Sequence, residues 1–208
     1  RVIADCACKN NQVYDEWIVR DQGAMVRQLG FSPKEFAKLI INQEKSNGGL
    51  KKVFDLKSDQ KSKYKPEKVP EKGSGKKYSE ILKSIFLDKY DFNDYARAAS
   101  IYWPGNKLGH GREDVKKFWQ IIKNTFSNIE FTVEHIGWLD EPNKNSKVSI
   151  RWFLNGFHSK NSEEFGDETN KNIFVMGINH AEIVDNNVIR EWVLFDEVAI
   201  WKQILMDN

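Results

Sequence analysis

The sequence predicts an α+β fold in which helices pack on one face of an antiparallel sheet. Two observations support this class. Apolar residues recur at helical spacing between residues 78 and 126, and long strand-like segments follow between residues 129 and 203. Helices that precede a run of strands, instead of alternating with them, are typical of α+β proteins.

The helical part divides into three predicted helices. Ser79 is expected to cap the first helix. A short second helix is predicted over Asp94–Ile101, and the turn Trp103-Pro104-Gly105 would end it. The third helix begins after Gly109-His110-Gly111. Its apolar positions follow the spacing of one helix face: Val115, Phe118, Trp119, Ile122 and Phe126.

Long strands are predicted in the last third of the chain. They cover Phe131–Leu139, Lys147–Ser159, Asn172–Val184 and Val188–Gln203. The polar segment Asp185-Asn186-Asn187 is a tight hairpin signal between the last two strands, so these two are expected to pair antiparallel.

The formal net charge of +2 over 208 residues conceals a segment of different composition. Residues 45–77 hold eleven Lys and four acidic residues, a balance of +7 that leaves −5 for the remainder. Pro66, Pro70 and a Gly-Ser-Gly motif lie in this segment, which is therefore predicted to be a linker. Because few aromatic residues interleave with the lysines, base stacking is not indicated and no nucleic-acid partner is expected.

Composition also bears on compartment and metal binding. No run approaches the roughly 20 apolar residues of a membrane helix, so no membrane partner is expected. Cys6 and Cys8 have no His or second Cys pair nearby, which argues against a zinc site. They are expected to be reduced thiols, as in a cytoplasmic protein.

Two segments of the chain repeat one pattern. Val13–Leu29 and Val188–Ile204 align without a gap, and Val, Glu, Trp, Asp, Ala and Gln recur at identical positions. We interpret this as a duplication. Residues 78–208 then form a complete module, and residues 1–44 are the C-terminal remnant of a first module, a hairpin followed by a helix. Most of that first module is expected to precede Arg1.

Several motifs of residues 78–208 occur in the order that a known family shows. They are Tyr102-Trp103-Pro104, Gly109-His110-Gly111-Arg112-Glu113 before Phe118-Trp119, Val148-Ser149-Ile150-Arg151-Trp152 with Gly156 and His158, Gly177-Ile178-Asn179-His180, and Ile189-Arg190-Glu191-Trp192 with Asp196 and Gln203-Ile204. Together they resemble the SnoaL-like polyketide cyclases, a branch of the nuclear-transport-factor-two-like superfamily.

The resemblance implies a strongly curved antiparallel sheet that helices close into a cone, with an apolar pocket inside. It also implies a homodimer or a pseudo-dimer of tandem modules. In the cyclases a carboxylate on the last long strand shuttles a proton during an intramolecular aldol closure, and a His of the neighbouring strand lines the same pocket. No cofactor and no metal take part.

Asp196 and His180 are the catalytic residues that the resemblance suggests. Apolar walls raise the pKa of a carboxyl group, which then accepts and donates a proton near neutral pH. On an alternating strand Asp196 would share a face with Trp192, and Glu191 would point to the other face. The cyclases, however, carry their Asp directly before a Trp and earlier on the strand.

Each catalytic candidate keeps an alternative role. Asp21 matches Asp196 in the first copy, and a residue present in both copies could satisfy backbone donors at a strand bend. His180 has no such counterpart, because Asp5 falls at its place. Its alternative is a core histidine with satisfied hydrogen bonds.

Further residues are expected to bind substrate. They are Tyr102, Trp103, Trp119, Arg151, Trp152, His158 and Trp192. Alternatives stay open for three of them. Arg151 could form an ion pair with Glu191 or Asp196, Trp152 could belong to the core, and His158 could lie at the surface or the rim of the pocket.

The sequence thus supports a protein that binds a small hydrophobic carbonyl compound and acts as a cofactor-free acid/base cyclase or isomerase. The alternative is a non-catalytic ligand-binding or dimerisation module, since one fold hosts many functions. An open cavity that holds Asp196 and His180 would favour the enzyme, and a filled interior would favour the alternative.

Overall fold

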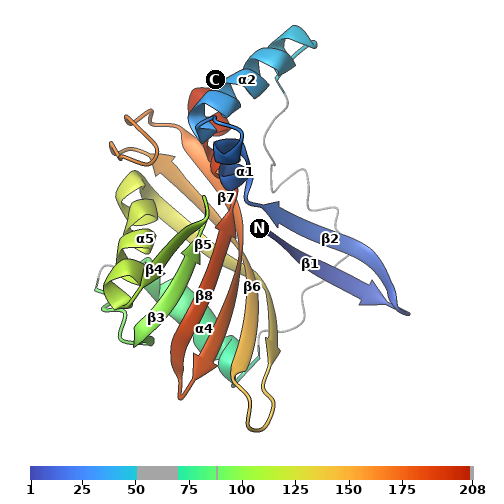
Figure 1. The fold of residues 1–208 in the computed structure, drawn as a ribbon, viewed down its shortest axis with the longest axis vertical. Coiled ribbons are helices and arrows are strands. Elements are labelled where there is room, and N and C mark those ends of the chain that lie inside the picture. Colours follow the sequence, from blue (N-terminus) through green and yellow to red (C-terminus); the bar gives the residue numbers. More distant parts are fainter. Residues whose placement is uncertain (51–69, 88, 207–208) are drawn as a thin grey trace.

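A computed structural model describes residues 1–50, 70–87 and 89–206 of the protein. Its centre is a six-stranded sheet in the order β4-β3-β8-β7-β6-β5. Every neighbouring pair is antiparallel except β3 and β8, which run parallel. The strands are β3 (Tyr95–Trp103), β4 (Lys107–His110), β5 (Phe126–Leu139), β6 (Ser146–His158), β7 (Asn172–Val184) and β8 (Asn187–Phe195). The sheet is curved and unclosed (Figure 1).

Two helices cover the inner face of this sheet, which confirms the α+β class and the cone shape. They are α4 (Ser74–Ile85) and α5 (Arg112–Thr125). The apolar stripe predicted for α5 is buried at Val115, Trp119 and Ile122. The side chains of α4, α5 and the inner face of the sheet form one continuous hydrophobic core.

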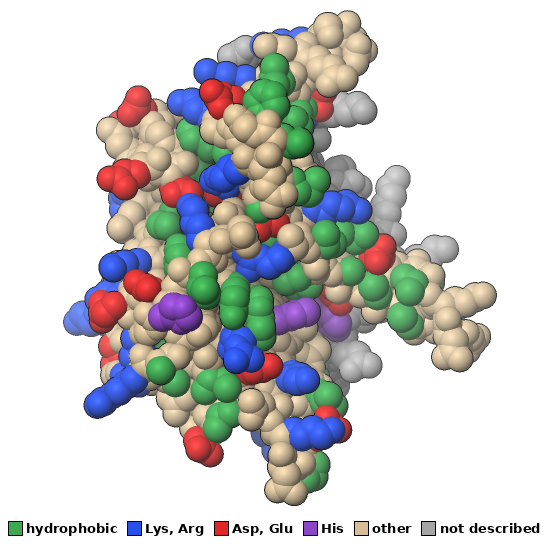
Figure 2. Space-filling model, viewed as in Figure 1, with side chains coloured by type: hydrophobic (Ala, Val, Ile, Leu, Met, Phe, Trp, Pro, Cys, Tyr) green, Lys and Arg blue, Asp and Glu red, His purple; other side chains and the backbone are tan. Residues whose placement is uncertain are grey.

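The N-terminal part of the chain packs on the outside of the sheet. It contains the hairpin of β1 (Val2–Lys9) and β2 (Gln12–Arg20), followed by α1 (Gln22–Gln28) and α2 (Pro33–Ser46). The hairpin projects from the body of the molecule, and α2 lies along α6 (Glu197–Leu205) (Figure 1). Apolar side chains follow the projecting hairpin and gather in the middle of the same view (Figure 2).

Ser32 and Glu35 form the capping box that begins α2: the Glu35 amide donates to the Ser32 hydroxyl at 3.2 Å and the Ser32 amide donates to Glu35 at 2.8 Å. None of the helices in the described ranges is both long and apolar enough to cross a membrane.

The helix predicted over Asp94–Ile101 is wrong, because this segment is strand β3. Tyr95, Ala99 and Ile101 face the core, while β3 pairs on one edge with β4 and on the other with β8. Its Ala-rich sequence has good helix propensity, but the hydrogen bonds to two strands override it.

Three element boundaries also differ from the prediction by several residues. Strand β5 begins at Phe126 instead of Phe131, because α5 ends at Thr125 and the backbone of Phe126 is already extended. The first helix of the module begins at Ser74, and Ser79 lies inside it, where its hydroxyl donates to the carbonyl of Lys76. The last strand ends at Phe195 instead of Gln203, because Asp196 caps helix α6. The greater part of the predicted linker, residues 51–69, lies outside the described residues.

The two repeated segments adopt one local structure. In the first, β2 leads to Asp21, whose side chain accepts from the Ala24 amide and caps α1. In the second, β8 leads to Asp196, which accepts from the amides of Val198 and Ala199 and caps α6. Strand, Asp cap and helix therefore recur in both copies, and the division into two modules stays a prediction.

Candidate active site

A buried carboxylate, Glu191, lies at the centre of the inner face of the sheet. Its side chain is surrounded by donors and is 0% exposed. Oε1 accepts from the hydroxyl of Tyr78 at 2.5 Å and from that of Tyr95 at 3.1 Å. Oε2 accepts from Nε1 of Trp119 at 3.2 Å. Tyr78 comes from α4 and Trp119 from α5, so both covering helices contribute to the site.

Asn179 of β7 belongs to the same hydrogen-bond network as Glu191. Its Nδ2 lies 3.0 Å from the Tyr78 hydroxyl and 3.2 Å from Glu191 Oε1. Its Oδ1 accepts from Nε1 of Trp152 at 2.8 Å. The indole of Trp152 fits against β7 because Gly177 stands there: a Cβ on Gly177 would lie 2.1 Å from the ring. A chain of donors thus runs from Trp152 through Asn179 and Tyr78 to Glu191.

The electrostatics of the site follow from its burial. Burial raises the pKa of Glu191 to about 7, against the lowering effect of the four hydrogen bonds it accepts. Burial and the neighbouring Glu191 charge raise the pKa of Tyr78 and Tyr95 well above the usual value. Near neutral pH Glu191 therefore exchanges between its two protonation states, while both tyrosines keep their protons.

The prediction that Glu191 points away from the interior is wrong. Alternation along β8 directs Glu191, Val193 and Phe195 inward, and it places Trp192 on the outer face. Sequence reasoning took the face of Asp196 as the inner one and so missed Glu191. A signal was present, because Glu191 stands directly before a Trp, as the Asp of the cyclases does.

The structure does not bring Asp196 and His180 together in one pocket. His180 is on the outer face, where it lines pockets together with Trp192. Trp192 stacks on Tyr102 there, with ring centroids 5.4 Å apart. Asp196 stands at the end of β8 and lines a separate pocket beside β2. The catalytic roles of both residues stay predictions.

Arg151 also lies on the outer face, and its carboxylate partner differs from the predicted ones. Its Nε is 3.2 Å from Asp5 of the hairpin, and its guanidinium lies 4.3 Å from the centroid of the Trp17 ring. Asp5 contacts His135 as well, at 2.9 Å. These contacts hold the N-terminal hairpin to the sheet. The expected pairing with Glu191 or Asp196 is wrong.

The remaining predicted substrate residues lie inside the cone. Trp103, Trp119 and Trp152 are fully buried and in ring contact: centroids are 5.2 Å apart for Trp103 and Trp119, and 6.4 Å for Trp119 and Trp152. His158 is buried rather than at the surface or rim, and its Nδ1 lies 3.0 Å from the Thr169 hydroxyl. Aromatic rings thus fill much of the interior around Glu191.

No family model matches the chain, and no curated protein matches it. Solved structures do. IdmH of Streptomyces antibioticus, a proposed polyketide cyclase, has a TM-score of 0.51 at 16% identity, over 62% of this chain and 96% of IdmH.

Two further structures agree. A proposed SnoaL-like polyketide cyclase from Jannaschia sp. CCS1 has a TM-score of 0.52 at 15% identity, over 67% of this chain and 99% of that protein. AclR of Streptomyces galilaeus, a proposed hydroxylase, has a TM-score of 0.50 at 12% identity, over 65% of this chain and 86% of AclR. The chain therefore has the fold of the SnoaL-like polyketide cyclases.

Proposed function

We propose that this protein catalyses cofactor-free acid/base chemistry on a small hydrophobic carbonyl compound, with Glu191 as the proton shuttle. One observation carries the proposal. A fully buried carboxyl group with a pKa of about 7 accepts hydrogen bonds from two tyrosines on the inner face of the cone. A pKa near the working pH suits a group that must both take and return a proton.

The neighbouring side chains fit the other needs of such a reaction. Glu191 would take a proton from the carbon next to the carbonyl, which converts the substrate to an enolate. Tyr78 or Tyr95 would donate to the developing enolate oxygen, and their high pKa keeps them protonated. In a ring closure the enolate carbon attacks a second carbonyl, and Glu191 returns its proton to the new alkoxide.

Substrate entry requires a ring to move. Phe86 is partly exposed at the end of α4. It stacks on Phe131 at 4.7 Å and meets the Trp119 ring edge-on at 5.9 Å. Because Trp119 donates to Glu191, displacement of Phe86 would expose the ring that lies directly beside the carboxylate. Once the ring returns, water is excluded from the reaction.

The test measures proton exchange at carbon. The protein is incubated in D₂O with a panel of small ketones and 1,3-diketones, and NMR follows deuterium uptake next to the carbonyl. We expect uptake above the buffer rate for at least one compound, and Glu191→Gln should reduce it at least 100-fold. Glu16→Gln changes the equivalent residue of the first copy, so it should leave the rate unchanged. Uptake that survives in a folded Glu191→Gln protein would overturn the proposal.

A second function, a non-catalytic association module, is favoured by the aromatic rings that fill the interior around Glu191 and by a separate observation. The hairpin and the outer face of the sheet meet through matching residues: Val19 packs with Ile178 and Leu194, and Ile3 joins the same cluster. The repeat aligns Val19 with Leu194 and Ile3 with Ile178. Such self-matching contact is typical of a two-fold interface. We propose that this contact is the core of a pseudo-dimer between tandem modules.

The two proposed functions predict different experimental results. For an association module, a ligand panel would raise the thermal unfolding temperature without deuterium uptake at carbon. The pseudo-dimer also predicts a monomer in light-scattering measurements at micromolar concentration, because the hairpin already occupies the outer face. A homodimer that forms with the hairpin in place would contradict it.

A further inference from the structure

The pocket that Asp196 lines is on the outer side of the sheet, away from Glu191. It occupies about 180 Å³ between β2, β7 and the start of α6. Apolar side chains such as Ile18, Val19, Met176 and Ile200 form most of its walls. Asp196 supplies a carboxylate, and the exposed Arg20 stands among the lining residues. The pocket therefore combines apolar walls with one largely enclosed anionic group.

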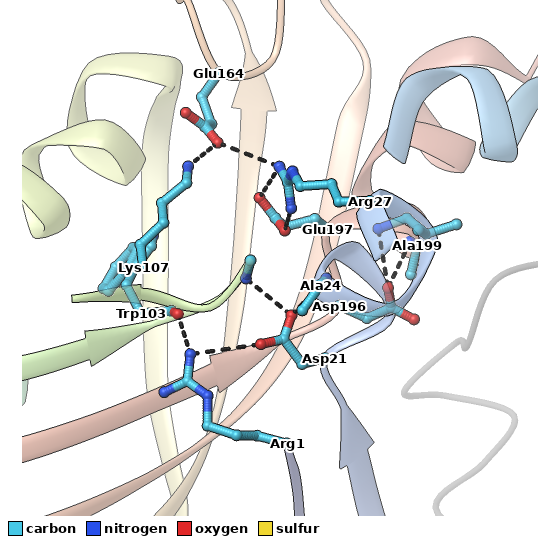
Figure 3. Close-up of polar contacts among 12 residues, drawn as sticks. Arg1, Asp21, Ala24, Arg27, Trp103, Lys107, Glu164, Asp196, Glu197 and Ala199 are labelled. Atoms are coloured by element: carbon cyan, nitrogen blue, oxygen red, sulfur yellow. Dashed lines mark hydrogen bonds and ion pairs between the residues drawn. The ribbon is translucent and has the colours of Figure 1, made fainter. Parts of the chain in front are cut away.

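Only one of the two carboxylate oxygens of Asp196 accepts hydrogen bonds from the described residues. Oδ1 accepts from the Val198 amide at 2.9 Å and from the Ala199 amide at 3.2 Å (Figure 3). Among the residues that the structure describes, Oδ2 accepts no hydrogen bond. Burial raises the pKa of Asp196 to about 6, so the group is still mainly ionised at pH 7.5.

The equivalent residue of the first copy shows the contrast. Asp21 uses both of its oxygens: Oδ1 accepts from the amides of Ala24 at 3.0 Å and Gly105 at 2.8 Å, and Oδ2 lies 3.4 Å from the Arg1 guanidinium (Figure 3). A cap alone therefore does not require a free oxygen. Oδ2 of Asp196 is an acceptor left available beside an apolar pocket.

We propose that this pocket binds a small molecule with an apolar body and a protonated amine, which donates to Oδ2 of Asp196. An engineered apolar cavity of about 150 Å³ holds benzene, so this space suits one ring with a short side arm. An amine gives a charge-assisted hydrogen bond, the stronger kind. Arg20 is exposed, and water screens its charge. The proposal does not depend on the chemistry of Glu191.

Benzylamine, benzoate and toluene serve as probes of matched size at pH 7.5. The protein is labelled with ¹³C at its methionine methyl groups, because Met176 lines the pocket while Met25 is exposed on α1. We expect benzylamine to shift the Met176 signal saturably and to leave Met25 unchanged. Benzoate should bind at least tenfold more weakly.

Variants separate the site from the cap. Asn caps a helix as well as Asp does, so Asp196→Asn should fold and weaken benzylamine binding at least tenfold. Ala199→Leu fills the pocket and should abolish binding, and Asp21→Asn should not affect it. The proposal is overturned if no probe shifts Met176 saturably, if benzoate binds as well as benzylamine, or if benzylamine binds Ala199→Leu unchanged. Full affinity in a folded Asp196→Asn protein would overturn the role of Oδ2.

Discussion

The two repeated segments of this chain share a local structure, yet their glutamates have opposite environments. Glu191 is enclosed by tyrosine, tryptophan and asparagine donors inside the cone. Glu16, its counterpart, is exposed on the hairpin, where the Cys6 thiol lies 3.4 Å away. Local sequence therefore determines the strand, the cap and the helix. The elements packed against the strand determine what a carboxylate can do.

The pairing register of the two hairpins explains part of this difference between Glu191 and Glu16. Glu191 pairs with Ala181 across β7 and β8, and Glu16 pairs with Cys6 across β1 and β2. Two residues before Ala181 stands Asn179, and two before Cys6 stands Ala4. The first copy thus has a methyl group where the second has an amide donor. The described part of the first copy does not reproduce the network around Glu191.

The largest predicted difference between the copies concerns these glutamates. Glu191→Ala removes the acceptor of four buried donors and leaves a cavity, so we expect a loss of about 4 kcal/mol in the free energy of unfolding. Glu16→Ala should change it by less than about 0.5 kcal/mol, as for other exposed sites. Urea unfolding of both variants provides the measurement, and equal losses would remove the distinction.

The contact between the N-terminal hairpin and the sheet should contribute nearly as much to the free energy of unfolding. Asp5→Ala removes the carboxylate that faces the buried Arg151, and we expect a loss of about 3 kcal/mol. Amide hydrogen exchange should become faster in β1 and β2 and stay slow in β6. Glu141→Ala breaks an exposed pair with Lys144 and serves as the control, with a loss below about 0.5 kcal/mol. Unchanged exchange in the hairpin would show that Asp5 does not hold it.

The buried glutamate also predicts how stability depends on pH. The pKa of Glu191 is raised in the folded protein to about 7 from an ordinary value of 4.5, so the folded state binds the proton more tightly. Its contribution is fully present below about pH 4.5 and is lost as pH rises to about 7, by roughly 2–3 kcal/mol. Urea unfolding at pH 5 and pH 8 should show this fall in stability. The raised pKa of Asp196 should lower the free energy of unfolding in the same direction between about pH 4 and 6. The fall should be smaller in Glu191→Gln and unchanged in Glu16→Gln.

The smallest effects concern the two caps. Asp196→Ala should cost about 1 kcal/mol, the usual loss for an N-cap. Asp21→Ala should cost about 2 kcal/mol, because Asp21 also accepts from Gly105 and faces Arg1. Substitution of either by Asn should restore most of the loss. Thermal unfolding is the measurement, and a larger loss at Asp196 would reverse this order.

Features encoded by neighbouring residues were predictable from the sequence. Strand β7 has the predicted limits, and the Asp185–Asn187 hairpin is present. These signals depend on contacts within a few residues. The resemblance to the cyclase family also gave the correct fold, because it rests on motifs spread along residues 78–208.

Features that depend on distant contacts were not predictable in the same way. Segment 94–101 became a strand because β8, almost a hundred residues later, pairs with it in parallel. Arg151 pairs with Asp5 of the N-terminal hairpin, almost 150 residues earlier in the chain. The inward direction of Glu191 was missed because one strand was extended past Phe195, so the face of a helix cap was taken as the face of a pocket.

The packing of the N-terminal hairpin on β7 and β8 has a consequence during protein synthesis. Ile3 and Val19 leave the ribosome long before Ile178 and Leu194, their contacts in the folded state. At about 5–20 residues per second, the delay is roughly 10–35 s. During that interval Ile3 and Val19 cannot form their contacts with Ile178 and Leu194. These two apolar side chains are therefore available for non-native contacts until the last two strands are made, and slow synthesis or a lack of chaperones should reduce the yield of folded protein.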